Sequence, residues 1–181
     1  MEQIKKIIAK AAYGQSAKVF SKGIDINTYE RKRPTKVLGC IITDAEISGC
    51  TFEGNVENGK AVRVNGKFDT HLWYGLDGDT KVAKVSTKFS DIITVHAQGA
   101  EMYSDEEIRA WIAQAPKCCG TSITDGLEGA CVKAQVEYEL GAEIVGLTTL
   151  NVKVMNAVSE VNDIEEVTVE DKADIDEFED D

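Results

Sequence analysis

Two runs of alternating residues between Ala61 and Ala97 constrain the fold more than any other part of the chain. The first run has polar residues on odd positions and apolar residues on even positions. The apolar residues are Val62, Val64, Phe68, Leu72, Tyr74 and Leu76. The second run has an apolar face made of Ala83, Val85, Phe89, Ile93 and Val95. Turn residues 77–80, with a flexible Gly78, separate the two. A period of two is typical of strands with one buried face, so the block predicts a long antiparallel hairpin.

Pairing Leu76 with Lys81 across this turn gives a trial register for the hairpin. It places favourable pairs on the polar face: Asp69 with Lys88 and Trp73 with Lys84. It also places Asp91 on the apolar face, opposite Gly66. Because an unsatisfied carboxylate there would be costly, we interpret Asp91 as a structural hydrogen-bond acceptor that must find donors.

Two further segments have the spacing of amphipathic helices. Residues 2–13 place isoleucines and an alanine on one side (Ile4, Ile7, Ile8 and Ala11). Residues 104–115 begin with Ser104 and Glu107, which form a capping box, and stop before Pro116. We therefore predict a short helix over each segment, with Trp111 as a core anchor of the second.

The remaining apolar segments read as strands. They are residues 17–27, residues 36–43 (nearly continuous, hence buried on both faces), a second hairpin over 117–124 and 128–140, and residues 148–154. Residues 44–59 are predicted as a more polar connection, with a strand around residues 50–52 as an option, and residues 141–146 as the connection to the last strand. We predict a mainly β domain over residues 1–158, an antiparallel β-sandwich or a partly closed barrel with two short helices; an α+β fold is the alternative.

The charge of the chain is concentrated at its end. Net charge is −12 overall; residues 159–181 hold twelve acids and one lysine, so they account for −11 and the body for −1. Such a segment predicts a disordered acidic tail and argues against a nucleic-acid partner. No apolar run approaches the length that spans a bilayer, so membrane insertion is not expected.

The sequence offers little catalytic chemistry. Phosphate loops, zinc spacings and nucleophile elbows are absent from the sequence, so we expect no cofactor, metal site or catalytic group. There are five cysteines, and the vicinal pair Cys118 and Cys119 could cross-link in an oxidising setting or remain two ordinary thiols. Reducing cytosol is the default compartment for synthesis.

Two alternatives remain open from the residues alone. One is a hydrolase using Asp69, His71 and Asp91, although the trial register sends the two carboxylates to opposite faces. The other is a soluble ligand-binding sandwich with an aromatic site at Trp73, Tyr74 and Trp111.

An ordered set of short motifs resembles a known family. The motifs are Val37-Leu38-Gly39-Cys40, Phe68-Asp69, Trp73-Tyr74, Asp79-Thr80-Lys81, Phe89-Ser90-Asp91-Ile92, Pro116-Lys117-Cys118 and Glu143-Ile144-Val145-Gly146. In this order and spacing, from about Lys5 to Val154, the chain resembles the CotE family of outer spore-coat morphogenetic proteins. It departs from the family pattern in a longer segment 43–65, in extra cysteines (Cys50, Cys119 and Cys131), and in a less densely acidic tail.

The resemblance implies a non-enzymatic scaffold of endospore-forming bacteria. Such a protein is made in the mother-cell cytoplasm, forms homo-oligomers, and assembles into the spore coat. It docks on basal coat proteins and recruits outer-coat proteins, partly through its C-terminal region. Asp69, Trp73, Tyr74, Asp91, Trp111, Cys118 and Cys119 are the candidate structural or interaction residues.

Overall fold

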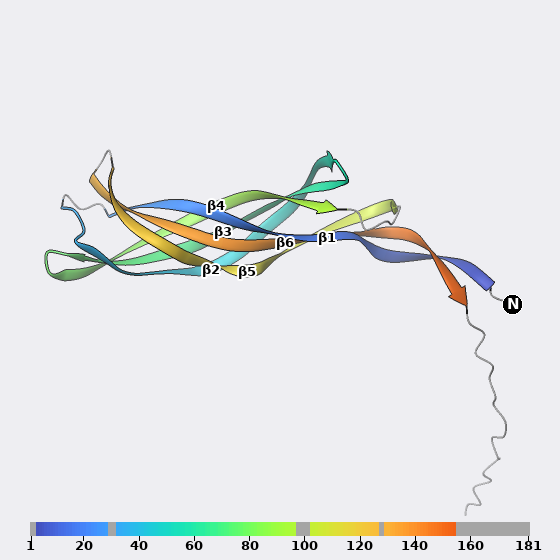
Figure 1. Cartoon of the computed structure of the whole chain (residues 1–181), viewed down its shortest axis with the longest axis horizontal. Coiled ribbons are helices and arrows are strands. Elements are labelled where there is room, and N and C mark those ends of the chain that lie inside the picture. The colour runs from blue at the N-terminus through green and yellow to red at the C-terminus, as the bar shows by residue number, and fades with distance from the viewer. Residues whose placement is uncertain (1–2, 29–31, 97–101, 127–128, 155–181) are drawn as a thin grey trace, which may run out of the picture.

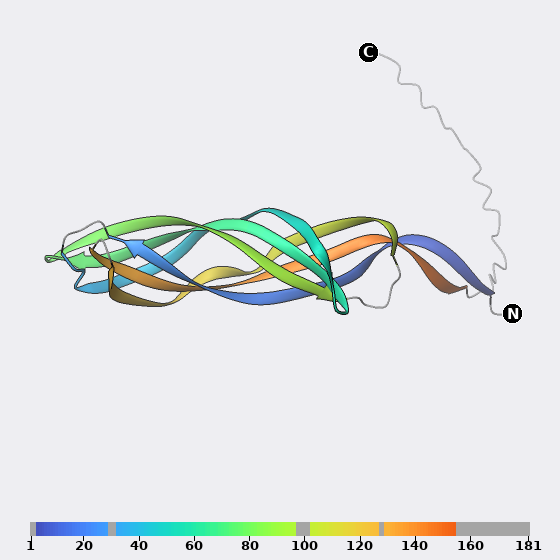
Figure 2. The ribbon, with the colours of Figure 1, turned by 90° about the horizontal axis from the view of Figure 1, so that it is seen from above.

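The protein is built from six long antiparallel strands. The computed structural model describes residues 3–28, 32–96, 102–126 and 129–154. The strands are β1 (Gln3–Asn27), β2 (Lys36–Val56), β3 (Gly59–Leu76), β4 (Asp79–His96), β5 (Met102–Gly126) and β6 (Gly129–Val154). They form two three-stranded sheets with the orders β1-β6-β5 and β2-β3-β4. The sheets lie over one another as an elongated sandwich, with β1 beside β4 and β2 beside β5 (Figures 1 and 2).

The predicted mainly β, sandwich-like class is confirmed, and the described strands do not close into a barrel. The two predicted helices are wrong. Residues 3–13 belong to β1 and pair with β6, whereas residues 104–115 belong to β5. Consequently, the α+β alternative fails for the described residues. The predicted acidic tail, residues 159–181, lies outside them.

β5 mimics a helix in sequence because Trp111, a large apolar residue on its outer face, has helical spacing with the inward-facing Ile108 and Ile112. Its inward side chains, Ile108, Ala110 and Ile112, do alternate and pack against the core. The register then shifts between Ile112 and Gln114 and again between Gln114 and Lys117. Pro116 lies in the second shift, on an outer strand of the sheet, where its missing N–H removes no ladder bond.

β1 mimics a helix for a different reason. Its isoleucines occupy both faces of the strand, so their spacing loses the period of two. β-Branched side chains fit a pleated strand better than a helix, and β6 supplies a continuous hydrogen-bonding partner, with Ile4 opposite Lys153 and Ile8 opposite Thr149.

The core lies between the central strands β3 and β6. The even-numbered residues 62–76 of β3 and 130–148 of β6 are buried, as the alternation of β3 predicts. An aromatic cluster fills the middle: the Tyr138 ring lies 5.8 Å from Phe68, 5.2 Å from Phe89 and 5.9 Å from Phe20, measured between centroids. Removing one such ring would cost about 3–5 kcal/mol.

The trial register of the first hairpin is wrong by two residues. Leu76 pairs with Asp79, not with Lys81, because the turn consists of Asp77 and Gly78 alone. Both have positive φ (51° and 87°), which is the geometry of a type I′ turn and the known preference of Asp-Gly. The shift moves Asp69 opposite Ser86 and Trp73 opposite Val82, so the predicted pairs with Lys88 and Lys84 do not form. The faces stay as predicted, because a shift of two keeps every side chain on its side.

β2 also differs from expectation. It was predicted to be a strand buried on both faces over residues 36–43, followed by a polar connection. It is instead an outer strand that runs on to Val56, with Leu38 and Ile41 about half exposed. Four register shifts interrupt its pairing with β3, which is typical of sheet edges. Likewise β6 continues through residues 141–146, which were predicted as a connection.

Candidate functional site

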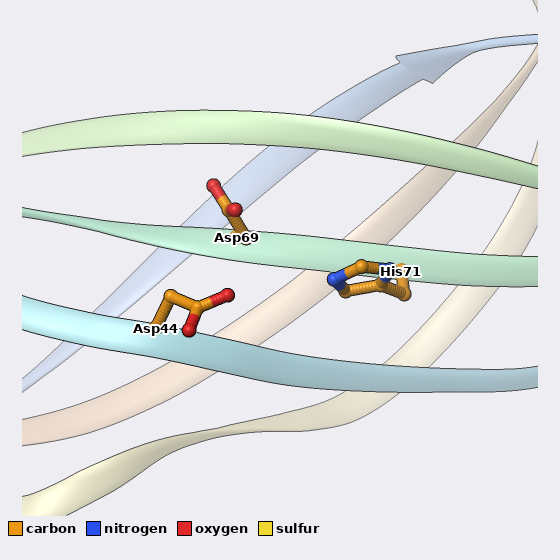
Figure 3. A group of neighbouring side chains, drawn as sticks. All are labelled: Asp44, Asp69 and His71. Atoms are coloured by element: carbon orange, nitrogen blue, oxygen red, sulfur yellow. The ribbon is translucent and has the colours of Figure 1, made fainter.

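Three ionisable side chains meet on the outer face of the β2-β3-β4 sheet. Asp44 comes from β2, and Asp69 and His71 come from β3 (Figure 3). One ligand atom of each lies within 4.8 Å of the others. Asp69 and His71 are two residues apart in a strand and therefore share a face, as the sequence indicated.

A bulge in β2 brings Asp44 to this group. The register shifts between Thr43 and Glu46, and Asp44 adopts φ of 52°. The Thr43 hydroxyl donates to Oδ2 of Asp44 at 2.9 Å and lies 3.1 Å from Nε2 of His71. Since this hydroxyl gives its one proton to Asp44, the contact with His71 requires the ring N–H as donor.

Asp69 is held on the other side by β4. Its Oδ2 lies 2.6 Å from Nζ of Lys84. Hydrogen bonds from Lys84 first, and from Ser86 second, hold the pKa of Asp69 below its usual value. The same contact raises the pKa of Lys84.

Two carboxylates and an imidazole could in principle hold a divalent cation. Here, however, Lys84 already forms an ion pair with Asp69, and the Thr43 hydroxyl accepts a hydrogen bond from Nε2–H of His71. A cation would have to displace both. The group therefore acts as a hydrogen-bonded brace that joins β2, β3 and β4 across a bulge, and it confers no evident catalytic chemistry.

The three predicted hydrolase residues do not all come together, because Asp91 lies apart from Asp69 and His71. Asp91 pairs with Val64, not with the predicted Gly66, and Val64 is fully buried, so Asp91 faces the space between the sheets. Its Oδ2 accepts a hydrogen bond of 2.6 Å from the Tyr138 hydroxyl. Asp69 and His71 point to the opposite, outer face. The second histidine, His96, faces Gly59, twelve positions along β3 from His71.

The predicted aromatic site does not form either. Trp73 lies on the outer face and stacks on His71, with centroids 6.3 Å apart, while Tyr74 is buried and directs its hydroxyl to the Thr28 carbonyl at 3.5 Å. Trp111 belongs to the other sheet. It is half-buried on that sheet's outer face, where its ring covers Gly141, so its predicted role as a core anchor is wrong. A Cβ at Gly141 would lie 2.3 Å from the indole, which explains the glycine.

The vicinal cysteines have different surroundings, because the register shifts between Cys118 and Gly120 and Cys119 lies in that shift. Cys118 packs against the core, whereas Cys119 is exposed, with its Sγ 3.4 Å from a carboxylate oxygen of Glu137. Burial, followed by this hydrogen bond, raises the pKa of Cys119. A reactive thiolate is not favoured there.

Two surface hollows, of about 250 and 210 Å³, gather no catalytic set. The larger is lined by residues of β1 and β4 that include Lys18 and His96. The smaller lies at the β3–β4 turn near Lys36 and Asp79. The part of the chain that the structure describes also holds no helix able to cross a bilayer.

Sequence reasoning missed two features. Asp44 was assigned to a connection, and the only signal for it was a polar pair, Thr43-Asp44, at the end of an apolar run. The second feature is a projection at one end of the molecule, here called the terminal ribbon: residues 3–8 of β1 and 149–154 of β6. These residues pair with each other, and among the described residues the ladder between β5 and β6 reaches as far as Met102 and Thr148.

The described residues form a long two-sheet sandwich, in which the acids, histidines and thiols discussed above make hydrogen bonds, ion pairs and packing contacts. The chain belongs to the outer spore coat protein E (CotE) family, whose sequence profile matches residues 3–181, essentially the whole chain. The predicted family is thus confirmed, and the protein is a spore coat protein. Neither the curated proteins nor the solved structures contain a significant match to the chain.

Proposed function

We propose that this protein is a non-enzymatic scaffold that self-assembles in the spore coat and recruits outer-coat proteins. In this proposal it is made in the mother-cell cytoplasm, binds copies of itself and basal coat proteins, and then presents its C-terminal segment to clients. The observation that carries self-assembly is the terminal ribbon.

The terminal ribbon extends past the sandwich. In both views the two strand ends next to the labelled N-terminus project beyond the other strands (Figures 1 and 2). β3 and β4 end near the base of the ribbon and do not cover it. An isolated two-stranded ribbon is marginally stable in water, so a ribbon of this kind gains stability when another surface covers it.

Both faces of the terminal ribbon expose large aliphatic side chains. On one face Ile4 and Ile8 are 71% and 78% exposed. The other face continues the core-facing side of β6, where Ala142 and Ile144 are buried, but here Ile7, Leu150 and Val152 remain 45%, 39% and 37% exposed. Exposed aliphatic groups gathered at one end of a molecule are typical of interaction surfaces.

A second copy is a suitable partner for this surface. Homo-oligomers are the commonest protein assemblies, and a surface repeated on every copy can pair with itself or with a neighbour's strand edge. The four outer strands, β1, β5, β2 and β4, also offer edges for strand addition. Bulges interrupt the edges of β2 and β5, so the more regular edge of β1 is the better candidate for strand addition.

Recruitment is proposed for residues 159–181. Their net charge of −11 and sparse apolar residues suit a segment that binds basic clients through many weak contacts. The family to which the chain belongs supports a position in the outer coat.

Self-assembly is tested by a charge substitution in the ribbon. We expect Ile4→Lys combined with Ile8→Lys to lower the molar mass measured by size-exclusion chromatography with light scattering. The matched control is Val82→Lys, which changes a 56% exposed aliphatic residue of β4 next to the hairpin turn, away from the ribbon. Equal masses for the double variant and the wild type would reject the ribbon as the assembly site.

Recruitment is tested in spores. A chain ending at residue 158 should still enter the coat, while outer-coat proteins are lost from purified spores. A full set of outer-coat proteins in these spores would reject recruitment by the acidic segment without affecting the conclusion on self-assembly.

A further inference from the structure

Two cysteines from different sheets face each other inside the sandwich. Cys40 lies on β2 and Cys118 on β5, the outer strands that run side by side along one flank of the molecule. Cys40 is paired in register with Leu72, and Cys118 with Val136. Because Leu72 and Val136 are fully buried, the cysteines opposite them also point between the sheets.

The two thiols are neighbours. Both pack against the core, and the Cys118 thiol lies close enough to Cys40 to help raise the pKa of the Cys40 thiol. The flank around them is closely packed, since Sγ of Cys50 on β2 also reaches the Ile108 carbonyl of β5 at 3.6 Å. A disulfide between these two thiols would join β2 to β5, and it forms only where the two cysteines are close neighbours.

The other cysteines have different surroundings. Cys119 points out of the sheet toward Glu137, Cys131 lies 3.0 Å from Oγ1 of Thr124, and Cys50 contacts a backbone carbonyl. The described residues therefore favour one pairing. The vicinal pair Cys118 and Cys119, which the sequence suggested, is disfavoured because Cys118 packs against the core whereas Cys119 is exposed.

We propose that Cys40 and Cys118 form an intrachain disulfide that joins the two sheets when the protein meets a small-molecule disulfide. The thiolate of one cysteine attacks the small disulfide and releases one small thiol. The thiolate of the other cysteine then attacks the mixed disulfide and releases the second small thiol. The two cysteines together lose two electrons and two protons, and the small disulfide gains them as two thiols.

This chemistry is slow at neutral pH and accelerates in alkali. Burial, and next the neighbouring Cys118 thiol, raises the pKa of Cys40 to about 12. Whichever cysteine attacks first, Cys40 must act as a thiolate in one of the two steps. The rate of closure should therefore rise about tenfold per pH unit while that step is limiting. In a reducing cytosol the pair stays as thiols.

The test uses the purified, reduced full chain incubated with oxidised glutathione. Intact-mass spectrometry under denaturing conditions should show a single chain lighter by about 2 Da without a glutathione adduct. Free thiols should fall from five to three, and a peptide map should join Cys40 to Cys118. The melting temperature should rise by roughly 10 °C, because the link closes a long loop in the unfolded chain.

Matched single variants show which two cysteines form the disulfide. Cys40→Ser and Cys118→Ser should each abolish the loss of 2 Da, whereas Cys119→Ser should retain it. Cys40→Ala serves as a second variant, and circular dichroism checks that each chain is folded. A link that persists in Cys40→Ser, a Cys118–Cys119 peptide, or a stable glutathione adduct in the wild type would overturn the proposal. Since the mass is that of one denatured chain, none of these outcomes bears on self-assembly.

Discussion

The hydrogen bond between Tyr138 and Asp91 offers a sharp test of how the two sheets hold together. Tyr138 is on β6 and Asp91 on β4, so this bond of 2.6 Å crosses the sandwich next to the aromatic cluster. The variant Tyr138→Phe keeps the ring and removes only the hydroxyl. The ring contacts with Phe68 and Phe89 should survive, so the change isolates the hydrogen bond.

The expected loss follows from the charge of the acceptor. Hydrogen bonds to charged groups contribute about 1.5–3 kcal/mol, and Asp91 is left between the sheets without this donor. For a domain of this size the same loss lowers the melting temperature by roughly 3–12 °C. The assay is urea unfolding followed by tryptophan fluorescence for four chains: wild type, Tyr138→Phe, Asp91→Ala and the double variant.

The double-mutant cycle separates the pair from its surroundings. A coupling energy of about 1 kcal/mol or more is expected for partners in direct contact. A loss below about 0.5 kcal/mol for Tyr138→Phe, or a coupling energy near zero, would refute the view that this bond ties the sheets together.

The pH dependence of the stability of Tyr138→Phe is a second test of this hydrogen bond. Burial, and then the Asp91 carboxylate, raises the pKa of Tyr138 above the ordinary 10.0. The folded state thus holds the phenol proton more tightly than the unfolded state does. The corresponding stability is present below pH 10 and is lost as pH rises above 10. Tyr138→Phe should flatten this alkaline decline; an unchanged slope would contradict the assignment.

Three further predictions follow from packing and charge. Gly14→Ala should destabilise the protein strongly, because its Cβ would lie 2.0 Å from the His96 carbonyl oxygen, whereas Gly49→Ala, with open space around it, should have little effect in the same thermal melts. Arg109 and then Lys10 lower the pKa of Glu107 to about 2, so NMR titration should find it ionised at pH 3, and Glu107→Gln should flatten the acid dependence of stability between pH 4.5 and 2. Removing residues 159–181 should leave the melting temperature unchanged, because that segment has too few apolar residues to offset its ordering entropy; a clear drop would show that it packs on the body.

The sequence predicted the fold best where one face of a strand is fully buried. The alternation from Val62 to Leu76 identified the core-facing side of β3. A polar side chain buried against β6 would be destabilising, so the inward positions are consistently apolar or small. The hairpin β5–β6 was found for the same reason. Even the error in the first turn left every side chain on the correct face.

The sequence predicted outer strands poorly. β1, β2 and β5 each have one unpaired edge; β2 and β5 contain several bulges and β1 contains one. Apolar residues also occur on both faces of these strands, so Ile108, Trp111 and Ile112 imitate a helix although they lie in a strand. Only the pairing with β6, which is far away in the sequence, makes the strand evident.

The candidate site was predicted in part. The adjacency of Asp69 and His71 follows from strand periodicity, and so does the separation of Asp69 from Asp91. The positions of Asp44, Lys84 and Cys40 relative to their partners depend on one bulge, one two-residue turn and the stacking of two sheets. Each of these is a tertiary feature without a local signal.

Absolute molar mass in solution tests the central claim most directly. The full chain of 19.7 kDa should elute, at micromolar concentration, with a light-scattering mass several times that value, and the mass should increase with concentration. A constant mass of one chain across the whole concentration range would contradict the proposal that this spore coat protein is a self-assembling scaffold.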